Sequence, residues 1–112
     1  MPRIQMIEDQ SSVGVQPMFD SSTGMLYTLA GAAVTVTGIT SGLAFVRNWS
    51  DVTCWVRWDG SAAAPVTGDA DGNACPSFPL IKGESYWFPA TATGTLSLYG
   101  TGNIFVMGAK VA

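Results

Sequence analysis

Short apolar runs separated by turn-forming residues dominate the chain from Met25 onward. Gly, Pro, Asn, Asp or Ser stands at nearly every junction, and no run shows the 3.6-residue period of an amphipathic helix. The expected strands are 25–29, 33–37, 43–47, 52–59, 78–81, 84–88, 95–100 and 103–111. Such spacing is typical of antiparallel sandwiches, jelly rolls and small barrels. The sequence therefore predicts an all-β fold, a single-domain antiparallel β-sandwich or jelly roll of about eight strands.

The first 24 residues lack this alternation. They contain Pro2, Gly14 and Pro17, so we expect an extended N-terminal arm over 1–24 and a β-sandwich domain over 25–112. The arm holds more apolar residues than a solvated tail needs, namely Ile4, Met6, Ile7, Val13, Val15, Met18 and Phe19. This composition predicts docking on its own domain or on a neighbouring subunit. A short edge strand followed by a loop fits equally well.

Charge is scarce in this chain. Charged residues make up 12% of it and apolar residues 47%, whereas an ordinary soluble domain carries roughly 25% charged residues. So few charges cover the surface of a free monomer poorly, and exposed apolar surface promotes association. We therefore expect a homo-oligomer or a subunit of a larger assembly.

The charge pattern also argues against two classes of partner. The net charge is −3 and the five basic residues are scattered, which disfavours direct contact with nucleic acid. The segment 21–46 carries no charge, but its four glycines favour β-hairpins over a membrane-spanning helix. The start of the chain has charges and no apolar run, so we expect no signal peptide and no membrane partner.

Catalytic chemistry finds little support in the residue types. The chain has no histidine, which removes Ser-His and Cys-His pairs and His-based zinc sites. A glycosidase-like carboxylate pair remains an alternative, but the acids stand mostly at turn positions. These candidate acids are Asp51, Asp59, Asp69, Asp71 and Glu84. We expect a protein that is not an enzyme and that has no catalytic residues and no cofactor.

Two further motifs have ordinary structural interpretations. The segment GDADGN, 68–73, resembles the start of a calcium loop but has no bidentate Glu downstream, so a turn without metal is favoured. Cys54 and Cys75 are compatible with one disulfide, and we expect two reduced thiols instead.

The aromatic residues are the most informative candidates. Alternation over 52–59 places Val52, Cys54, Val56 and Trp58 on the core face, with Trp55 and Arg57 on the opposite face. In 84–88, Trp87 faces away from Tyr86 and Phe88, so one aromatic group must lie outside the core. Three hypotheses follow: cover by the arm or a loop of the same chain, contact with another subunit, or a sugar-stacking platform made by Trp55 and Trp87.

One long irregular connection, 59–77, separates two of the expected strands. Loops of this length in a compact domain usually make contacts or carry function. Its first half is rich in alanine and nearly uncharged, and it includes Ala63 and Ala64. This composition suits packing against a partner.

Three segments, WVRWDGSAAAPV, FPLIKGESYWFPA and LSLYGTGNIFVM, resemble the small β-sandwich structural proteins of tailed-bacteriophage particles. The resemblance covers roughly residues 43–107. It implies a capsid decoration or cement protein that is made in the host cytoplasm, is located in the virion and bridges major-capsid subunits, with a trimer as one expected form. A tail, baseplate or fibre-attachment protein and a carbohydrate-binding module are the alternatives. The candidate interface residues are Ile4, Met6, Ile7, Phe19, Trp55, Arg57, Ala63, Ala64 and Trp87.

Overall fold

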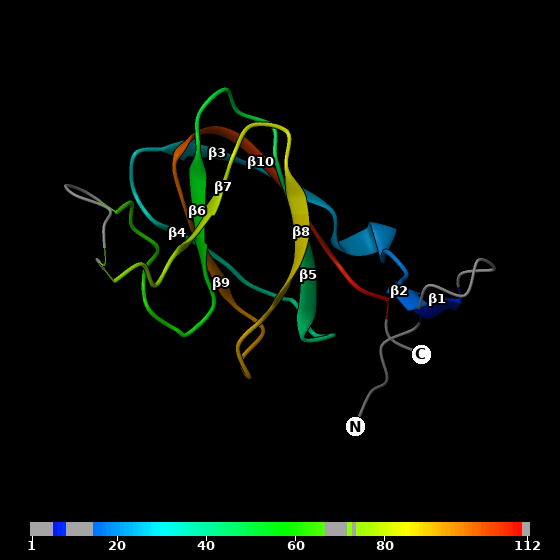
Figure 1. The fold of residues 1–112 in the computed structure, drawn as a ribbon. Helices are drawn as coiled ribbons and strands as arrows, with labels where there is room; N and C mark the ends of the chain where they lie inside the picture. Colours follow the sequence, from blue (N-terminus) through cyan, green and yellow to red (C-terminus); the bar gives the residue numbers. More distant parts are fainter. Residues whose placement is uncertain (1–5, 9–14, 67–71, 73, 111–112) are drawn as a thin grey trace.

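The computed structural model describes residues 6–8, 15–66, 72 and 74–110. Over these residues it contains strands and one 3-10 turn but no α-helix, and eight of the strands form two antiparallel sheets packed face to face (Figure 1). Sheet I has the order β3 (Met25–Ala30), β10 (Thr101–Gly108), β5 (Leu43–Asn48), β8 (Ser85–Pro89). Sheet II has the order β4 (Val34–Val36), β9 (Leu96–Tyr99), β6 (Cys54–Arg57), β7 (Phe78–Leu80). The predicted eight-stranded sandwich is confirmed.

The order in which the strands pair is that of a jelly roll. β3 pairs with β10, β4 with β9, β5 with β8 and β6 with β7, so the first sandwich strand meets the last and each following pair is nested inside. The chain changes sheet at every connection except the one from β6 to β7. The four antiparallel strand pairs thus follow one another and together form two four-stranded sheets. This topology matches the jelly-roll alternative of the prediction.

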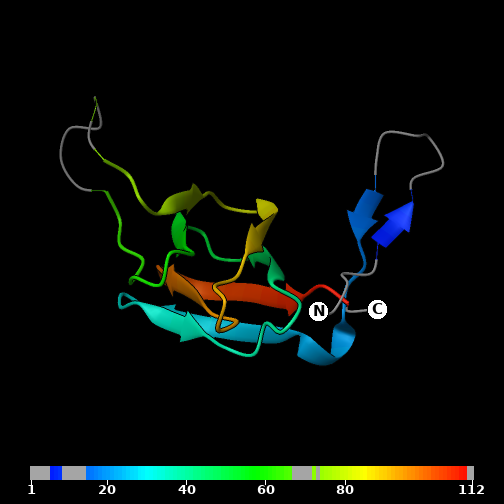
Figure 2. The same cartoon turned by 90° about the horizontal axis from the view of Figure 1, so that it is seen from below.

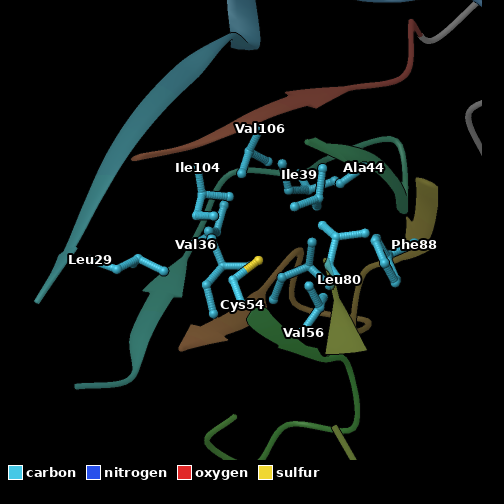
Figure 3. Close-up of a cluster of buried hydrophobic side chains, with 13 residues drawn as sticks. Leu29, Val36, Ile39, Ala44, Cys54, Val56, Leu80, Phe88, Ile104 and Val106 are labelled. Atoms are coloured by element: carbon cyan, nitrogen blue, oxygen red, sulfur yellow. The ribbon is translucent and has the colours of Figure 1, made fainter. Parts of the chain in front are cut away.

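The core lies between the two sheets and is filled by the alternate residues of each strand (Figure 3). Because side chains in a strand point to opposite faces in turn, each strand contributes every second residue to this layer. Burying each Leu, Ile, Val or Phe side chain contributes about 1.5–3 kcal/mol. The buried cluster is Leu29, Val36, Ile39, Ala44, Val46, Cys54, Val56, Leu80, Phe88, Leu96, Leu98, Ile104 and Val106.

A single buried amide joins the two sheets at the end of β5. The Nδ2 group of Asn48 donates to the carbonyl oxygens of Val52, at 2.7 Å, and Leu80, at 2.8 Å. Its Oδ1 accepts from the backbone N–H of Ser50 at 2.8 Å and from the Ser50 hydroxyl at 2.6 Å. Every donor and acceptor of this side chain is therefore satisfied, which a fully buried polar group requires.

The N-terminal segment contains a small hairpin that the sequence did not predict. β1 (Met6–Glu8) pairs antiparallel with β2 (Val15–Pro17) outside the two sheets, and a 3-10 turn, η1 (Ser21–Thr23), leads from it into β3. Figure 2 shows the hairpin beside one end of the sandwich, while the described part of the connection between β6 and β7 extends from the other end. The two segments expected to contact partners thus lie at opposite ends of the molecule.

Candidate interaction surfaces

The outer face of sheet I carries a cluster of three aromatic rings that we call the arm cluster: Phe19, Phe45 and Trp87. Phe45 and Trp87 are cross-strand partners on β5 and β8, with ring centroids 5.5 Å apart. Phe19 stacks on Trp87 at 5.1 Å and meets Phe45 edge-on at 5.0 Å. The outward-facing Trp87 is therefore covered in part by its own chain, although 49% of Phe19 remains exposed.

Backbone pairing holds Phe19 in this position. Phe19 forms an antiparallel bridge with Ala109, just after β10. On either side, Asp20 N–H donates to the Gly108 carbonyl at 2.9 Å and Lys110 N–H donates to the Met18 carbonyl at 2.7 Å. The last part of the predicted arm thus belongs to the edge of the sandwich. Met6 and Ile7 lie in β1, and Ile4 lies outside the described residues.

The outer face of sheet II carries Trp55 and Arg57. Trp55 lies between its cross-strand partners Tyr99 and Pro79 and is half-buried. The Arg57 guanidinium donates to both carboxylate oxygens of Asp59, through Nε at 2.7 Å and through a terminal nitrogen at 2.8 Å. The hydrogen bonds from Arg57 are the largest contribution that lowers the pKa of the Asp59 carboxyl group to about 2. The positive charge of Arg57 is already matched within the chain.

Two backbone N–H groups of the alanine-rich loop donate to serine hydroxyls, one on β9 of sheet II and one at the residue before β7. Ala63 N–H donates to Ser97 Oγ at 2.8 Å, and Ala64 N–H donates to Ser77 Oγ at 3.1 Å. Ala63 is only 2% exposed, so its methyl group is buried within the chain. The prediction that Ala63 contacts a partner is therefore wrong. Ala64 stays exposed. Next to this loop, a polar hollow of about 280 Å³ is lined by residues that include Arg57, Ser61 and Thr95.

The hypothesis of a sugar platform built from Trp55 and Trp87 is wrong in its geometry. The two side chains lie on the outer faces of different sheets, on opposite sides of the sandwich. One carbohydrate chain cannot stack on both rings. In addition, Phe19 already occupies one face of the Trp87 ring.

A second group of aromatic rings lies where β7 and β8 form the open edge of the sandwich. We call it the edge cluster: Trp58, Phe78, Tyr86 and Phe88. Phe78 is central, with centroids 5.5 Å from Phe88 and 5.6 Å from Tyr86, and Trp58 lies 5.4 Å from Phe88. Phe88 is 3% exposed, whereas Tyr86 is 46% exposed, and Trp58 and Phe78 are exposed as well. Three rings thus reach solvent at one edge.

The alternation of apolar residues did not predict this edge. It shows which side chains share a face of a strand, but not whether the strand lies at the edge or in the centre of a sheet. Trp58 was predicted to be core, but β6 ends at Arg57 and the ring lies beyond the end of the strand. Val52 was predicted to be core too, and it is exposed because β6 begins only at Cys54. Tyr86 shares a face with the buried Phe88 and contacts Phe78 of the opposite sheet, yet its ring stays exposed at the edge. Clustering of three exposed aromatics is visible only in the fold.

Glu84 orients the edge cluster. One carboxylate oxygen accepts the hydroxyl of Tyr86 at 3.2 Å, and the other accepts the backbone N–H of Ile81 at 2.8 Å. The negative charge of Glu84, together with this hydrogen bond, raises the pKa of Tyr86. The phenol hydroxyl is thus hydrogen-bonded at the tip of an exposed ring.

Groups that could carry chemistry are dispersed. Cys54 is buried and Cys75 is exposed, and both are free cysteines. Over the described residues, no three His, Cys, Asp or Glu side chains gather where they could hold a metal ion. In the GDADGN segment only Gly72 lies within the described residues, so the predicted turn stays a prediction there.

The uncharged segment 21–46 forms β3, β4 and the start of β5. Within the part of the chain that the structure describes, no helix has the length and apolarity needed to cross a membrane. No protein-family model, no curated protein and no solved structure matches this chain.

Proposed function

We propose that this protein is a non-enzymatic structural component of a bacteriophage particle, a decoration or cement protein that bridges major-capsid subunits. The observation that carries the proposal is the edge cluster, in which three aromatic rings are exposed together at one edge of a rigid sandwich. Aromatic residues dominate the energetics of protein interfaces, and charges are depleted at interface centres. The low share of charged residues, 12%, together with such an edge supports a role as a subunit of a larger assembly.

Two further features support the same function. The segments that resemble tailed-phage structural proteins include Trp58 after β6, together with β7 and β8, which carry the other three rings of the edge cluster. The jelly roll is also a common architecture of viral capsid domains, although lectins and cupins share it and a fold alone does not assign a function. Cement proteins act by burying area across joints between capsomers, and modest contacts become strong when they are repeated over a shell.

The edge contact works through side chains rather than through added strands. β7 is three residues long and carries Pro79 in its middle, which has no N–H to offer a further strand. A partner at this edge therefore inserts between or against the rings of Trp58, Phe78 and Tyr86. This makes individual aromatic substitutions informative.

Purified virus particles from a host that produces this chain provide the test. We expect the protein to co-purify with capsids in many copies per particle and to appear as added density over capsomer joints in cryo-electron microscopy. Density on tails or baseplates alone would overturn the placement on the capsid. Absence from purified particles would overturn the virion function itself.

Binding of the recombinant protein to undecorated capsids tests the edge cluster. Tyr86→Ala should weaken binding by about 10-fold or more, the scale of an aromatic hot spot. Tyr86→Phe is the matched control, because it keeps the ring and removes only the hydroxyl that meets Glu84. We expect near-normal binding from this control and an unchanged melting temperature for both variants. Equal binding by Tyr86→Ala and the unmodified chain would show that the edge cluster is not the contact.

A further inference from the structure

The outer edge of β3 differs from the other three sheet edges. β4 and β7 are three residues long, and β7 carries Pro79. β8 ends in Pro89 and follows Glu84, so it has the prolines and charges that natural edges use against pairing. β3 spans six residues, MLYTLA, without a charge or a proline. Among the described residues, no strand lies on its outer side.

The backbone groups that point away from sheet I can be identified from the hydrogen bonds around β10. Trp49 N–H donates to the Asn103 carbonyl and Ala109 N–H to the Leu43 carbonyl, so the odd-numbered residues of β10 face β5. The even-numbered residues of β10 therefore face β3, and the bond from Gly31 N–H to the Gly100 carbonyl, at 2.8 Å, continues that ladder. Hydrogen-bonded and non-hydrogen-bonded pairs alternate in antiparallel sheets.

This alternation leaves three residues of β3 with outward backbone groups. The partners of the even-numbered β10 residues are Met25, Tyr27 and Leu29. Leu26, Thr28 and Ala30 accordingly direct both N–H and C=O away from β10, and all three side chains are exposed. Their donors and acceptors form a regular row along the edge, with Thr28 at its centre.

We propose that this edge is a self-association surface, at which two copies of the chain pair antiparallel through residues 25–30. A two-fold axis at Thr28 places Thr28 opposite its own copy and each Leu26 opposite Ala30 of the other chain. Six backbone hydrogen bonds then form, and a large side chain meets a small one on both sides of the axis. The two copies of sheet I become one eight-stranded sheet, an isologous arrangement in which one edge satisfies its own copy.

A second copy fits this edge because the row of three residues carries no charge and because antiparallel pairing sets the large Leu26 against the small Ala30. Leu26 is 54% exposed and gains cover from the pairing. Six paired residues bury less area than the roughly 1,200 Å² of a standard stable interface, so the dimer is reversible, with a dissociation constant on the order of micromolar or above. The inference concerns the free protein and does not depend on the proposed place in a particle.

Sedimentation velocity over a concentration series tests the pairing and its register. The unmodified chain should shift from monomer to dimer as its concentration rises. Leu26→Lys with Ala30→Lys places ammonium groups opposite each other at both contacts and should abolish the dimer. Leu26→Lys with Ala30→Glu places an ammonium group opposite a carboxylate and should restore it. Both variants change only exposed side chains, and circular dichroism should report the same fold.

Cross-linking gives an independent measure of the axis. In a hydrogen-bonded antiparallel pair the Cα atoms are about 5.5 Å apart, within the range of a disulfide. Thr28→Cys in a Cys75→Ser background should therefore form a covalent dimer on oxidation, whereas Thr93→Cys, exposed in the loop after β8, should not. A monomer at every concentration, a trimer, or equal dimerisation of both double variants would overturn the proposal.

Discussion

The ring of Phe19 stacks on the ring of Trp87, with centroids 5.1 Å apart and planes inclined by 25°. This contact joins the segment before η1 to the outer face of sheet I, and it covers an aromatic residue that alternation places outside the core. Stacked aromatic pairs contribute about 0.5–1.5 kcal/mol beyond the area they bury. The contact is therefore large enough to measure.

A double-mutant cycle on this pair is expected to show coupling. Phe19→Ala and Trp87→Ala should each lower the free energy of unfolding, and the double variant should lose less than their sum by about 0.5–1.5 kcal/mol. Urea unfolding followed by circular dichroism measures all four corners of the cycle. Strict additivity would show that Phe19 does not rest on Trp87 in solution.

The buried amide of Asn48 should be among the most sensitive positions in the chain. Asn48→Ala removes the four hydrogen bonds of this buried side chain and takes the Asn48 partner from the Leu80 carbonyl and from the Ser50 N–H, while the Ser50 hydroxyl keeps its bond to the Val52 carbonyl, so we expect a loss of about 3 kcal/mol in the free energy of unfolding. Asn103→Ala is the matched control, because its amide oxygen only accepts the exposed Thr28 hydroxyl. That control should lose about 0.5 kcal/mol or less. Similar losses in the two variants would refute the bridging role.

Stability should fall in alkaline solution because of Cys54. Burial raises the pKa of its thiol from the ordinary 9.0 to about 12. Between those two values the unfolded chain has released this proton and the folded chain still binds it, so rising pH favours unfolding, by up to about 1.4 kcal/mol per pH unit. Urea titrations from pH 8 to 11 should give a steeper decline for the unmodified chain than for Cys54→Ala. Parallel curves would contradict the prediction.

Gly102 should tolerate no side chain. Its φ is +101°, and an added Cβ would lie 2.6 Å from the Cβ of Ser50. Gly83 provides the comparison, because its φ is +79° but nothing lies within 4 Å of an added Cβ. Gly83→Ala should cost about 1–2 kcal/mol from backbone strain alone, and Gly102→Ala should cost about 1–3 kcal/mol more because of overpacking. Thermal unfolding of both variants measures the two effects: the loss in Gly83→Ala reports backbone strain, and the additional loss in Gly102→Ala reports the steric clash with Ser50.

Much of the fold was predictable because its signals are local. Turn residues between short apolar runs mark the strands, and alternation correctly assigned Cys54 and Val56 to the core, while it left open which face of 84–88 is buried. Asn48 could not be assigned in this way, because a polar residue at the end of a strand ordinarily indicates solvent. Its burial depends on carbonyl groups contributed by the β5–β6 loop and by β7.

The candidate surfaces were less predictable because they depend on where strands end and which strands lie at an edge. The period of two assigns Trp58 to the core face and leaves the register of Tyr86 open, and nothing in that period shows that both rings lie exposed at an edge. The contact of Phe19 with Trp87 likewise joins segments far apart in the sequence. Strand order, which produces both features, results from packing of the whole chain.

The pairing of Met18 with Lys110 determines how the molecule bears mechanical load. Because Phe19 and Ala109 lie in an antiparallel bridge, Met18 and Lys110 lie side by side at one end of that pairing. A pull that separates these two residues acts across the bridge, and its hydrogen bonds break one after another rather than together. A molecule held at Met18 and Lys110 would therefore release its Phe19 segment first, by breaking two backbone hydrogen bonds in turn.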